Sequence, residues 1–585
     1  MKNIFSILFL VILNCSASAQ GFDFFDFNNI KARINADGHL FWDEIGTASF
    51  EVPQGSGRHS IFAGGLWIGG YDNNGSLRTA AQTYRQGGGD FWPGPIGADT
   101  LNTFWHRVWK ISREEIDTFV YEFNLGFPDS NYVIPEAIQS WPGSDSISLQ
   151  QLLPYVDVDN DGLYNYTNGD YPCIKGDQAV AFIINDAAGY HHETGGGSLD
   201  VEVHGMAYGF RSQDSILNNT LFLNYKIISR NTTTPIDSCY IGSWTDFDLG
   251  YYDDDYIGCD VTRNMYYAYN GDNDDEGLSG YGINPPAQGV IFLKGPAADI
   301  NDGVDNDRDS CIDCSLFHSA VGDSIVPETI LPEYIAMSNF VYYENSHHPV
   351  NGKPFGAEDF YGYQRSIWRD GSHQTYGGNG HGGGFGATSD ISAFMYPGNS
   401  DPYFWGTNGI PEIPWDEVSA GNLPGDRRGV ASTGSFTMNP GMMICVDYAY
   451  VFARSNMGGP LASLDSLKLA ADYVQDFYNA HTELNQCDCQ MQVTSSVREY
   501  NLLKDISLFP NPAFDKLNLQ FTAMKPANTR IIISDYLGRE IASLPARVST
   551  GKNSFTIPVS ALSNGIYTLR LEDEPFFTSI KFIKY

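Results

Sequence analysis

Residues 517–522 read Leu-Asn-Leu-Gln-Phe-Thr, and this alternation of apolar and polar side chains predicts a β-strand with one buried face. The same alternation returns at residues 567–572, Tyr-Thr-Leu-Arg-Leu-Glu, and residues 530–534 predict a strand between the two. The sequence ends on residues 580–585, Ile-Lys-Phe-Ile-Lys-Tyr. From residue 506 onward we therefore expect a small β-sandwich of about 80 residues.

The remainder of the 585-residue chain is also predicted to be mainly β. Aromatic residues make up 14% and charged residues 18%, while glycine and proline number 61 and 29, which favours short strands and frequent turns over disorder. Before the C-terminal sandwich at 506–585 we expect a large β-rich region of one to three domains. We divide it into an N-terminal part, residues 20–150, and a central part, residues 151–500. Strands are expected in it at residues 118–123, 179–184, 221–228 and 289–293.

One amphipathic helix is expected near residues 464–480, and Asp465 is the candidate N-cap. Its apolar residues recur at helical spacing, which predicts a face packed on the core. They are Leu464, Leu467, Ala471, Val474, Phe477 and Tyr478.

Acidic side chains dominate the charge of the chain. There are 70 Asp and Glu against 34 Lys and Arg, so the formal net charge is −36. Such a surface repels phosphate backbones, and we therefore expect no nucleic-acid partner. Clustered carboxylates instead attract hard cations such as calcium, although a solvated acidic surface is the alternative.

The N-terminal residues 1–19 have the pattern of a secretory signal peptide. Lys2 precedes an apolar stretch at residues 4–13, and the small residues Ala17 and Ala19 fit a cleavage site. Lipid attachment at Cys15 is the alternative. No later stretch reaches the roughly 18 apolar residues of a membrane span, so the mature chain is expected to have no transmembrane segment.

Cleavage at this site leaves eight cysteines, an even number that permits disulfides in an exported protein. Their pairing is left open. We interpret Cys311-x-x-Cys314 and Cys487-x-Cys489 as disulfides or free thiols rather than zinc or redox sites, because no second CxxC stands at zinc-ribbon spacing. The eight are Cys173, Cys239, Cys259, Cys311, Cys314, Cys445, Cys487 and Cys489.

The C-terminal region resembles the type A sorting domain of the Bacteroidota type IX secretion system. Residues 508–513, Leu-Phe-Pro-Asn-Pro-Ala, and 515–517, Asp-Lys-Leu, resemble the opening of that domain. Residues 535–539, Asp-Tyr-Leu-Gly-Arg, and 559–567, Val-Ser-Ala-Leu-Ser-Asn-Gly-Ile-Tyr, follow in the order of the family, before a basic and apolar end. The resemblance assigns the sorting signal to Pro510, Asn511, Pro512, Asp515, Gly538, Gly565, Tyr567, Lys581 and Lys584.

This resemblance implies a route and a destination. The chain would cross the inner membrane by the general secretory route and the outer membrane through the type IX machinery. A surface peptidase would then remove the domain, and the cargo would remain outside the cell or become joined to anionic lipopolysaccharide. An ordinary terminal β-domain used for carbohydrate binding or rigidity is the alternative.

The central region is similar to an uncharacterised family of Bacteroidota exported proteins. The similar stretches include Phe-Ala-Gly-Gly-Leu-Trp-Ile-Gly-Gly at residues 62–70 and Ala-Gln-Thr-Tyr-Arg at 81–85. Phe-Trp-Pro-Gly-Pro at 91–95 and Gly-Asp-Arg-Arg-Gly at 425–429 complete the set. This second resemblance supports export and implies no reaction.

Residues 157–165, Asp-Val-Asp-Asn-Asp-Gly-Leu-Tyr-Asn, predict a calcium loop. Carboxylates at positions 1, 3 and 5 can converge on one ion, and glycine at position 6 permits the sharp turn. Asn168 stands at position 12 where an EF-hand has Glu, and an Asp-rich turn without an ion is the alternative. The candidate ligands are Asp157, Asp159, Asp161, the Leu163 carbonyl, Asn165 and Asp170.

A second acidic stretch at residues 301–309, Asn-Asp-Gly-Val-Asp-Asn-Asp-Arg-Asp, is a weaker candidate, because Arg308 replaces a frequent glycine. Its candidate ligands are Asp302, Asp305, Asp307 and Asp309. Calcium at either loop would have a structural role, since an ion that binds only the folded state stabilises it.

The search for catalytic motifs gives less. His191-His192-Glu193 lacks the second histidine of HExxH because residue 196 is glycine, and paired carboxylates for glycoside hydrolysis cannot be recognised by spacing alone. We therefore expect a calcium-stabilised, non-catalytic exported protein for adhesion, glycan binding or surface structure. The alternative is a secreted hydrolase that acts on polysaccharide or protein.

Overall fold

The structure is a computed structural model of the chain. It describes residues 21–84, 88–98, 103–127, 129–144, 150–212, 214–321, 324–330, 333–488, 503–523, 527–535, 539–563, 565–573 and 576–584. The predicted signal peptide, Cys489 and Gly538 lie outside these ranges. The chain forms two compact units, Met1–Gln490 and Met491–Tyr585.

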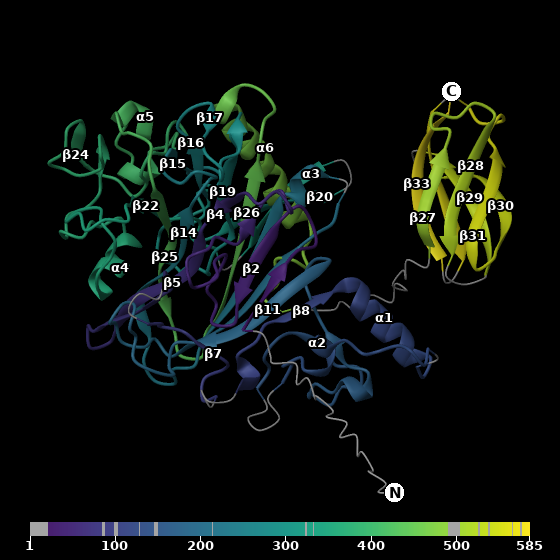
Figure 1. The fold of residues 1–585 in the computed structure, drawn as a ribbon, viewed down its shortest axis with the longest axis horizontal. Coiled ribbons are helices and arrows are strands. Elements are labelled where there is room, and N and C mark those ends of the chain that lie inside the picture. Colours follow the sequence, from purple (N-terminus) through teal and green to yellow (C-terminus); the bar gives the residue numbers. More distant parts are fainter. Residues whose placement is uncertain are drawn as a thin grey trace, which may run out of the picture. The chain divides into compact units, whose positions relative to one another are not determined.

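The first unit is built on a large antiparallel sheet that has nine strands within the described residues (Figure 1). In spatial order these are β15 (Asp255–Asp260), β16 (Met265–Asn270), β19 (Ala287–Lys294), β26 (Met443–Ala453), β13 (Thr220–Ser229), β12 (Val201–Gly209), β11 (Gln178–Asn185) and β7 (Trp92–Pro93), with β8 (Trp109–Ser112) also paired to β11. The strands expected at residues 179–184, 221–228 and 289–293 are confirmed as β11, β13 and β19.

A second sheet packs against the first. Its order is β22 (Asn339–Tyr343), β25 (Arg427–Met438), β14 (Ile236–Phe247), β5 (Ala63–Asp72) and β6 (Leu77–Ala81). A bridge from Leu40 to Gly64 joins it to a small sheet of β1 (Phe22–Phe25), β2 (Lys31–Asn35), β3 (Phe50–Glu51) and β4 (His59–Ile61). Because strands from residues 20–150 and 151–500 share both main sheets, these two regions form one unit.

The core lies between the two main sheets and is rich in aromatic residues. Tyr266 of β16 is fully buried, and its ring packs against Phe340 of β22 at 5.6 Å between centroids. Its hydroxyl lies 2.9 Å from Ser243 Oγ and 2.7 Å from Thr245 Oγ1, both on β14. Tyr266 therefore joins the sheets through apolar contact and through paired polar groups, which removes the cost of burying its hydroxyl.

The predicted helix is confirmed as α6 (Gly459–Ala480), which covers the other face of the large sheet over β16, β19 and β26 (Figure 1). Leu467 and Val474 are fully buried on its inner face. A Cβ on Gly289 would lie 3.2 Å from Leu467, so glycine lets the helix approach β19 closely. Asp465 lies inside the helix and does not cap it, because the helix begins six residues earlier.

The strand expected at residues 118–123 is wrong, because this segment belongs to α1 (Arg113–Asn124). Ser112 and Glu115 form a capping box that satisfies the first free backbone amides of the helix. Ile116 and Phe119, three residues apart, are its buried face. The β-branched and aromatic residues of the segment favour a strand, but the cap and the helical spacing decide the outcome.

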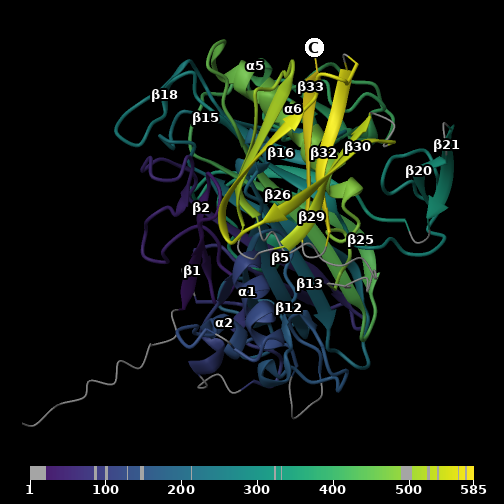
Figure 2. The ribbon, with the colours of Figure 1, turned by 90° about the vertical axis from the view of Figure 1, so that its right-hand side faces the viewer.

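Smaller elements complete the first unit. Strand pairs are β9 (Tyr155–Val156) with β10 (Tyr171–Pro172), β17 (Asp274–Asp275) with β18 (Gly282–Ile283), β20 (Ser315–Val321) with β21 (Ser324–Ile330), and β23 (Thr375–Gly377) with β24 (Ala387–Ile391). Short helices are α2 (Glu136–Gln139), α3 (Ser215–Asn218), α4 (Ala357–Tyr363), α5 (Glu417–Ala420), η1 (Thr103–Trp105), η2 (Tyr166–Asn168) and η3 (Trp405–Thr407). The hairpin of β20 and β21 lies at the periphery of the unit (Figure 2).

Disulfides join Cys311 to Cys314 and Cys445 to Cys487, and Cys173 is also in a disulfide. The Cys445–Cys487 bond ties the segment after α6 to β26. Cys239 and Cys259 are buried free thiols, and burial raises the pKa of both. Cys311 and Cys314 thus bond to each other, and Cys487 bonds to a cysteine outside its own closely spaced pair.

The second unit is the predicted β-sandwich. One sheet has the order β27 (Leu503–Phe509), β28 (Lys516–Ala523) and β31 (Gly551–Pro558), and the other β30 (Glu540–Val548), β29 (Ala527–Asp535), β32 (Gly565–Asp573) and β33 (Phe576–Lys584). Leu517, Leu519 and Phe521 of β28 point into its core, as their alternation predicts. Leu569 and Leu571 of β32 meet them from the other sheet.

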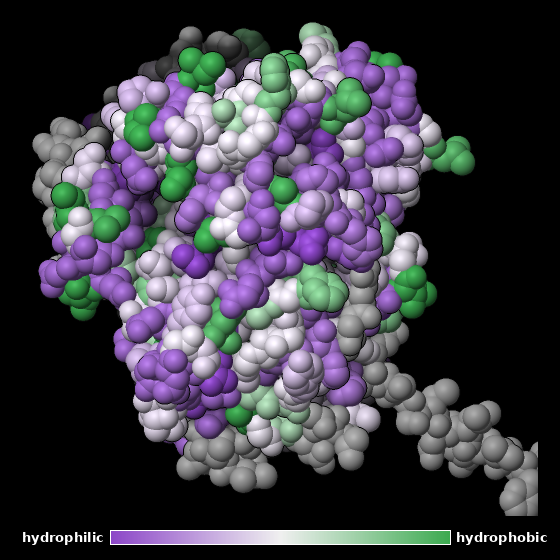
Figure 3. All heavy atoms as spheres, turned by 90° about the vertical axis from the view of Figure 1, so that its left-hand side faces the viewer, coloured by the Kyte–Doolittle hydropathy of each residue, from purple (hydrophilic) through white to green (hydrophobic). Residues whose placement is uncertain are grey.

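One face of the molecule carries polar and apolar side chains side by side (Figure 3). On the face drawn in Figure 3, hydrophobic residues are scattered among hydrophilic ones. Among the helices that the structure describes, none is long and apolar enough to span a membrane.

Replacing Tyr266 with phenylalanine should lower the free energy of unfolding of the first unit by about 1–3 kcal/mol, because Ser243 and Thr245 lose a buried partner. Tryptophan fluorescence during denaturation with urea measures this unit alone, since all 10 tryptophans precede residue 416. Tyr448→Phe is the matched control. Tyr448 is 1% exposed and its hydroxyl has no hydrogen-bond partner within the described residues, so its removal should cost nothing. Equal losses in the two variants would contradict this account.

Candidate functional site

An open pocket lies at one end of the five-stranded sheet, with a volume of about 380 Å³. We call it the aromatic–carboxylate pocket. This volume is within the usual range for small-molecule sites. It is lined by Trp42, Phe62, Tyr84, Asp246, Asp248, Tyr252, Asn345, Asp426 and Arg428.

Strand pairing places the charged residues of the pocket. Asp246, near the end of β14, is directly opposite Arg428 of β25, and on its other side opposite Ala63 of β5. The Arg428 Nε lies 3.2 Å from Asp246 Oδ1, and its Nη1 lies 2.5 Å from Asp426 Oδ1. One guanidinium therefore neutralises two carboxylates that are far apart in sequence.

Tyr84 joins this ion-pair network from the segment after β6. Its hydroxyl donates to Asp246 Oδ2 at 2.5 Å and accepts from Arg428 Nε at 2.7 Å. The segment is held against β5, because the indole of Trp67 donates to the Gln82 carbonyl at 2.9 Å and Gln82 accepts the Leu66 amide at 3.1 Å. The position of Tyr84 is thus fixed by backbone contacts made two residues earlier.

Three rings form the aromatic wall of the pocket. The centroids of Trp42, Phe62 and Tyr84 lie 5.9–6.1 Å from one another. The Trp42 indole N–H has no hydrogen-bond partner within the described residues. Because this nitrogen is itself buried, it does not count among the groups that the pocket presents to a ligand.

Three carboxylates, Asp246, Asp248 and Asp426, each place an oxygen within 4.8 Å of the other two. Burial raises the pKa of Asp246 to about 7, although the Arg428 charge opposes the shift. Burial and the neighbouring negative charges raise the pKa of Asp248. The cluster therefore keeps protons at a pH where ordinary aspartates have lost them, and the guanidinium beside it makes it a poor site for a cation.

The predicted calcium loop brings together three of its six candidate ligands. Asp157, Asp159 and Asp170 each place an oxygen within 4.8 Å of the others. Asp170 is 1% exposed, and its two oxygens accept the amides of Val158 and Asn165 at 2.8 Å. Burial and the charges of Asp157 and Asp159 raise the pKa of Asp170. This all-oxygen donor set suits calcium.

Two other candidate ligands make different contacts in the structure. The Asp161 carboxylate accepts the Leu163 amide at 2.8 Å and lies outside the group of three. The Asn165 side chain caps η2 by accepting the Thr167 amide at 3.1 Å, so it does not face the other candidates.

The weaker acidic stretch also brings three carboxylates together. Asp305, Asp307 and Asp309 each place an oxygen within 4.8 Å of the others. Asp302 is not among them, because its oxygens accept the Val304 amide at 2.8 Å and the Asn306 side chain at 3.0 Å.

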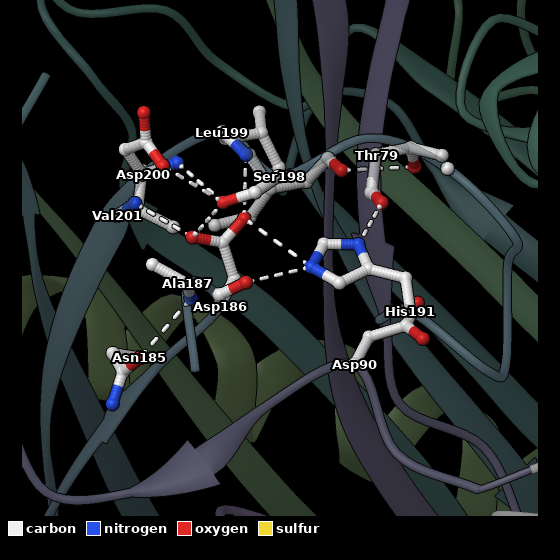
Figure 4. A network of polar contacts seen from close by, with 12 residues as sticks. Thr79, Asp90, Asn185, Asp186, Ala187, His191, Ser198, Leu199, Asp200 and Val201 are labelled. Carbon is white, nitrogen blue, oxygen red and sulfur yellow. Dashed lines mark hydrogen bonds and ion pairs between the residues drawn. The ribbon is translucent and has the colours of Figure 1, made fainter. Parts of the chain in front are cut away.

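His191 has a structural role (Figure 4). It is 1% exposed, with Nδ1 2.7 Å from the Thr79 carbonyl and Nε2 2.7 Å from the Asp186 carbonyl. The Asp186 carboxylate accepts the amides of Leu199 and Val201 at 2.6 and 2.8 Å, and burial raises its pKa to about 6. Since both ring nitrogens of His191 are engaged, this histidine is not placed to bind a metal.

The residues assigned to the sorting signal meet within the second unit. The Asn511 side chain donates to the Lys581 carbonyl at 3.3 Å and accepts the Ile583 amide at 2.9 Å, so the Pro-Asn-Pro motif is bonded to β33. Tyr567 stacks on Phe582 at 5.7 Å and donates to Ser563. Of the other assigned residues, Pro510, Pro512, Asp515 and Lys581 are exposed, Gly565 begins β32, and Lys584 is buried near the end of β33.

Residues 507–585 match the family described as the secretion system C-terminal sorting domain. The second unit is a type IX secretion sorting domain. The chain is therefore type IX secretion cargo, and this sorting domain implies a secreted or outer-surface location. The family match covers the sorting domain only, and no curated protein matches the chain.

The solved structures that the chain resembles include a polysaccharide lyase and a domain of a biofilm associated protein. A polysaccharide lyase is 9% identical, with 74% of this chain and 36% of the lyase covered and a TM-score of 0.17. This chain thus spans about a third of that protein's length. The BSP domain of a biofilm associated protein is 9% identical, with 97% and 81% covered and a TM-score of 0.13. TM-scores this low establish no common fold, and we draw nothing about activity from either protein.

Sequence reasoning missed the aromatic–carboxylate pocket. Three of the four stretches that resemble exported proteins contribute to it, through Phe62, Tyr84, Asp426 and Arg428. The one signal in the sequence was that these stretches all resemble the same family of exported proteins. Their contact in the fold could not be predicted, because Phe62 and Arg428 are 366 positions apart.

Replacing Arg428 with glutamine should leave Asp246 and Asp426 without their countercharge and lower the free energy of unfolding by about 3–5 kcal/mol at pH 8. The pKa of Asp246 is raised from 3.8 to about 7 in the folded chain, so its contribution to stability falls as the pH rises through this window. At pH 5 the protonated Asp246 needs less countercharge, and the loss should be smaller. Tryptophan fluorescence during denaturation at both pH values measures the difference.

Arg365→Gln is the control for this experiment. Arg365 lies over the Tyr361 ring at 4.9 Å and has no ion pair within the described residues. Its replacement should have the same small effect at pH 5 and pH 8. An Arg428→Gln loss that does not change with pH would contradict the assigned role of Asp246.

Proposed function

We propose that this type IX cargo binds an uncharged carbohydrate in the aromatic–carboxylate pocket, at the outer cell surface or outside the cell. The observation that carries the proposal is the combination of aromatic rings and carboxylates in one open pocket. Release of the sorting domain by a surface peptidase and attachment to anionic lipopolysaccharide belong to the same proposal.

The aromatic wall supports carbohydrate as the ligand class. One face of a sugar ring exposes C–H groups that pack on an aromatic ring, while its hydroxyls need hydrogen-bond partners. Phe62 and Tyr84 are partly buried, and Tyr252 adds a further ring that is 48% exposed. Asp248 and Asn345 offer polar groups for the hydroxyls.

The charge of the pocket favours neutral over anionic carbohydrates. Asp246, Asp248 and Asp426 outnumber the single cation Arg428, so the pocket is negative when the carboxylates are ionised. At a pH above the raised pKa values of Asp246 and Asp248, a uronic-acid or sulfated chain would be repelled. Neutral glycans avoid this repulsion, and their hydroxyls can donate to the carboxylates.

Replacing Tyr252 with alanine or Asp248 with asparagine should weaken the binding of neutral gluco-, manno- or xylo-oligosaccharides at least tenfold, which corresponds to about 1.4 kcal/mol. Isothermal titration calorimetry on the mature chain gives the dissociation constants. Tyr403→Ala is the matched control, because Tyr403 is 70% exposed and lies outside the pocket. Equal binding by the pocket variants and wild type, or tighter binding of anionic oligosaccharides, would reject the proposal.

A secreted glycoside hydrolase is the second candidate function. The observation that favours it is the pair Asp246 and Asp248, whose raised pKa values suit proton donation near neutral pH. Their nearest oxygens lie within 4.8 Å, closer to the roughly 5 Å separation of retaining glycosidases than to that of inverting ones. Product formation from the bound oligosaccharide, abolished in Asp248→Asn, would favour this function over binding alone.

We also propose that the loop at residues 157–170 binds calcium and stabilises the first unit. Support comes from Asp157, Asp159 and Asp170, whose oxygens gather around a buried carboxylate with a raised pKa. Three negative charges at this spacing repel one another, and a bound cation would relieve the repulsion.

Replacing Asp159 with asparagine should remove part of the rise in melting temperature that millimolar calcium gives the mature chain, because one of the gathered carboxylates loses its charge. Thermal unfolding with calcium and with a chelator measures the rise. Asp23→Asn is the control, since Asp23 is paired with Lys110 and belongs to neither acidic loop. An unchanged calcium response in Asp159→Asn would show that the loop is an ion-free turn.

A further inference from the structure

We infer that Asp305, Asp307, Asp309 and Glu333 form a further calcium site, in which Glu333 is the ligand that the linear motif does not contain. The inference does not depend on carbohydrate binding by the pocket. It concerns a different segment from the loop at residues 157–170.

Glu333 provides the observation that an acidic cluster alone lacks. It is 2% exposed, and its Oε1 accepts the backbone amides of Asn306 and Asp307, the latter at 3.0 Å. Its Oε2 is buried and has no hydrogen-bond partner within the described residues. A buried carboxylate oxygen without a hydrogen-bond partner is costly. The Glu333 carboxylate that carries this oxygen contacts the acidic loop directly, through the amides of Asn306 and Asp307. A cation at the loop supplies that partner.

The loop itself repeats the contacts of the loop at 157–163. The Asp309 amide donates to Asp305 Oδ1 at 3.0 Å and to Asp307 Oδ1 at 3.2 Å, and the Ser310 amide donates to Asp305 Oδ2 at 2.9 Å. The Cys311 amide donates to Asp309 Oδ1 at 2.8 Å.

In the first loop, the Asp161 amide donates to Asp157 and Asp159 at 3.2 and 3.3 Å, and the Gly162 amide donates to Asp157 at 2.8 Å. The Leu163 amide completes the pattern with its bond to Asp161. The two loops therefore share one backbone design, in stretches of sequence that lie 148 positions apart, counted from Asp157 to Asp305.

The backbone angles agree with this equivalence. Arg308 and Ser310 have φ of 64° and 76°, and their counterparts Asn160 and Gly162 have φ of 59° and 79°. Serine thus adopts the left-handed conformation that glycine adopts in the first loop.

Glu333 corresponds to Asp170 in one backbone contact. The oxygens gathered within 4.8 Å of one another differ, because the first loop gathers Asp170 and the second gathers Asp309 in its place. The Asp170 carboxylate accepts the amide of Val158, the second residue of the first loop, and the Glu333 carboxylate accepts that of Asn306, the second residue of this one. Asp170 lies 13 positions after Asp157, whereas Glu333 lies 28 positions after Asp305. The β20–β21 hairpin is inserted between the loop and Glu333, which explains why a linear motif does not contain this ligand.

Arg308 is the residue that departs from the expected motif, and its charge interacts with those of Asp305 and Asp307 without a direct ion pair to either among the described residues. Its guanidinium turns away from the carboxylates and donates to the Met337 carbonyl at 2.9 Å and the Val261 carbonyl at 3.2 Å. It also lies over the rings of Phe394 and Trp405 at 5.6 and 5.5 Å. Arg308 therefore anchors the loop to the body of the first unit.

The position of the site gives the ion a role. The loop leads into β20, and Glu333 follows β21, so an ion bound by both joins the two ends of the peripheral hairpin (Figure 2). The Cys311–Cys314 disulfide lies at the same base. The ion would fix the point at which the hairpin leaves the first unit.

The test uses the mature chain with Asp159→Asn, so that the first loop does not dominate the calcium response. Glu333→Gln is added to this background. Its amide oxygen can still accept the Asn306 and Asp307 amides, and an unchanged melting temperature in chelator verifies the fold. Equilibrium dialysis with calcium alone gives stoichiometry and affinity. Glu358→Gln, an exposed carboxylate of α4, is the matched control.

We expect the Asp159→Asn chain to bind one calcium ion at the loop around Asp305, and Glu333→Gln to weaken that affinity at least tenfold while Glu358→Gln does not. Calcium should also slow proteolytic cleavage at the hairpin base, and Glu333→Gln should abolish this protection. Calcium binding that is unchanged by Glu333→Gln would overturn the assignment of Glu333. No calcium binding in the Asp159→Asn background would overturn the site itself, whatever the result at the first loop.

Discussion

Burial of two antiparallel sheets against each other is the constraint on which the first unit depends. The aromatic core between the sheets fixes β14 and β25 as neighbours, and the pairing of those strands sets Asp246 opposite Arg428. On the other side of β14, β5 brings the segment of Phe62 and holds the segment of Tyr84. The pocket therefore exists because the core enforces one strand register, and a shift by one residue would turn its side chains to the other face.

The pocket and the acidic loops hold their buried charge in different ways. At the pocket, Arg428 compensates Asp246 and Asp426, and Tyr84 shares their hydrogen bonds. At the acidic loops, backbone amides donate hydrogen bonds to the carboxylates of Asp170 and Glu333. Among the described residues, no cationic side chain forms an ion pair with either carboxylate, in contrast to Arg428 and Asp246. The pocket carboxylates are thus paired with a cationic side chain of the chain itself, whereas the carboxylates of Asp170 and Glu333 are held by backbone amides.

Sequence patterns predicted the structure within single elements, but they did not predict contacts between residues that are far apart in the sequence. The alternation at residues 517–522 and the helical spacing from Leu464 describe contacts within one element, and both appear as expected. The strand predicted at residues 118–123 was wrong. Their aromatic and β-branched side chains favour a strand, but the cap at Ser112 begins a helix that includes them. The proximity of Asp157 and Asp159 could be predicted because their spacing is local. The position of Glu333 could not, since only the fold returns it to its loop.

The sorting domain brings together motifs that are separated in the sequence. Asn511 stands near the beginning of the domain, yet its side chain bonds the backbone on both sides of Phe582 in the last strand. Ala513 continues this contact through its amide to the Ile583 carbonyl at 2.8 Å. The Pro-Asn-Pro motif and the basic end are therefore adjacent only when β33 is paired in the sandwich. A receptor that contacts both segments would thus recognise the folded domain rather than either short sequence.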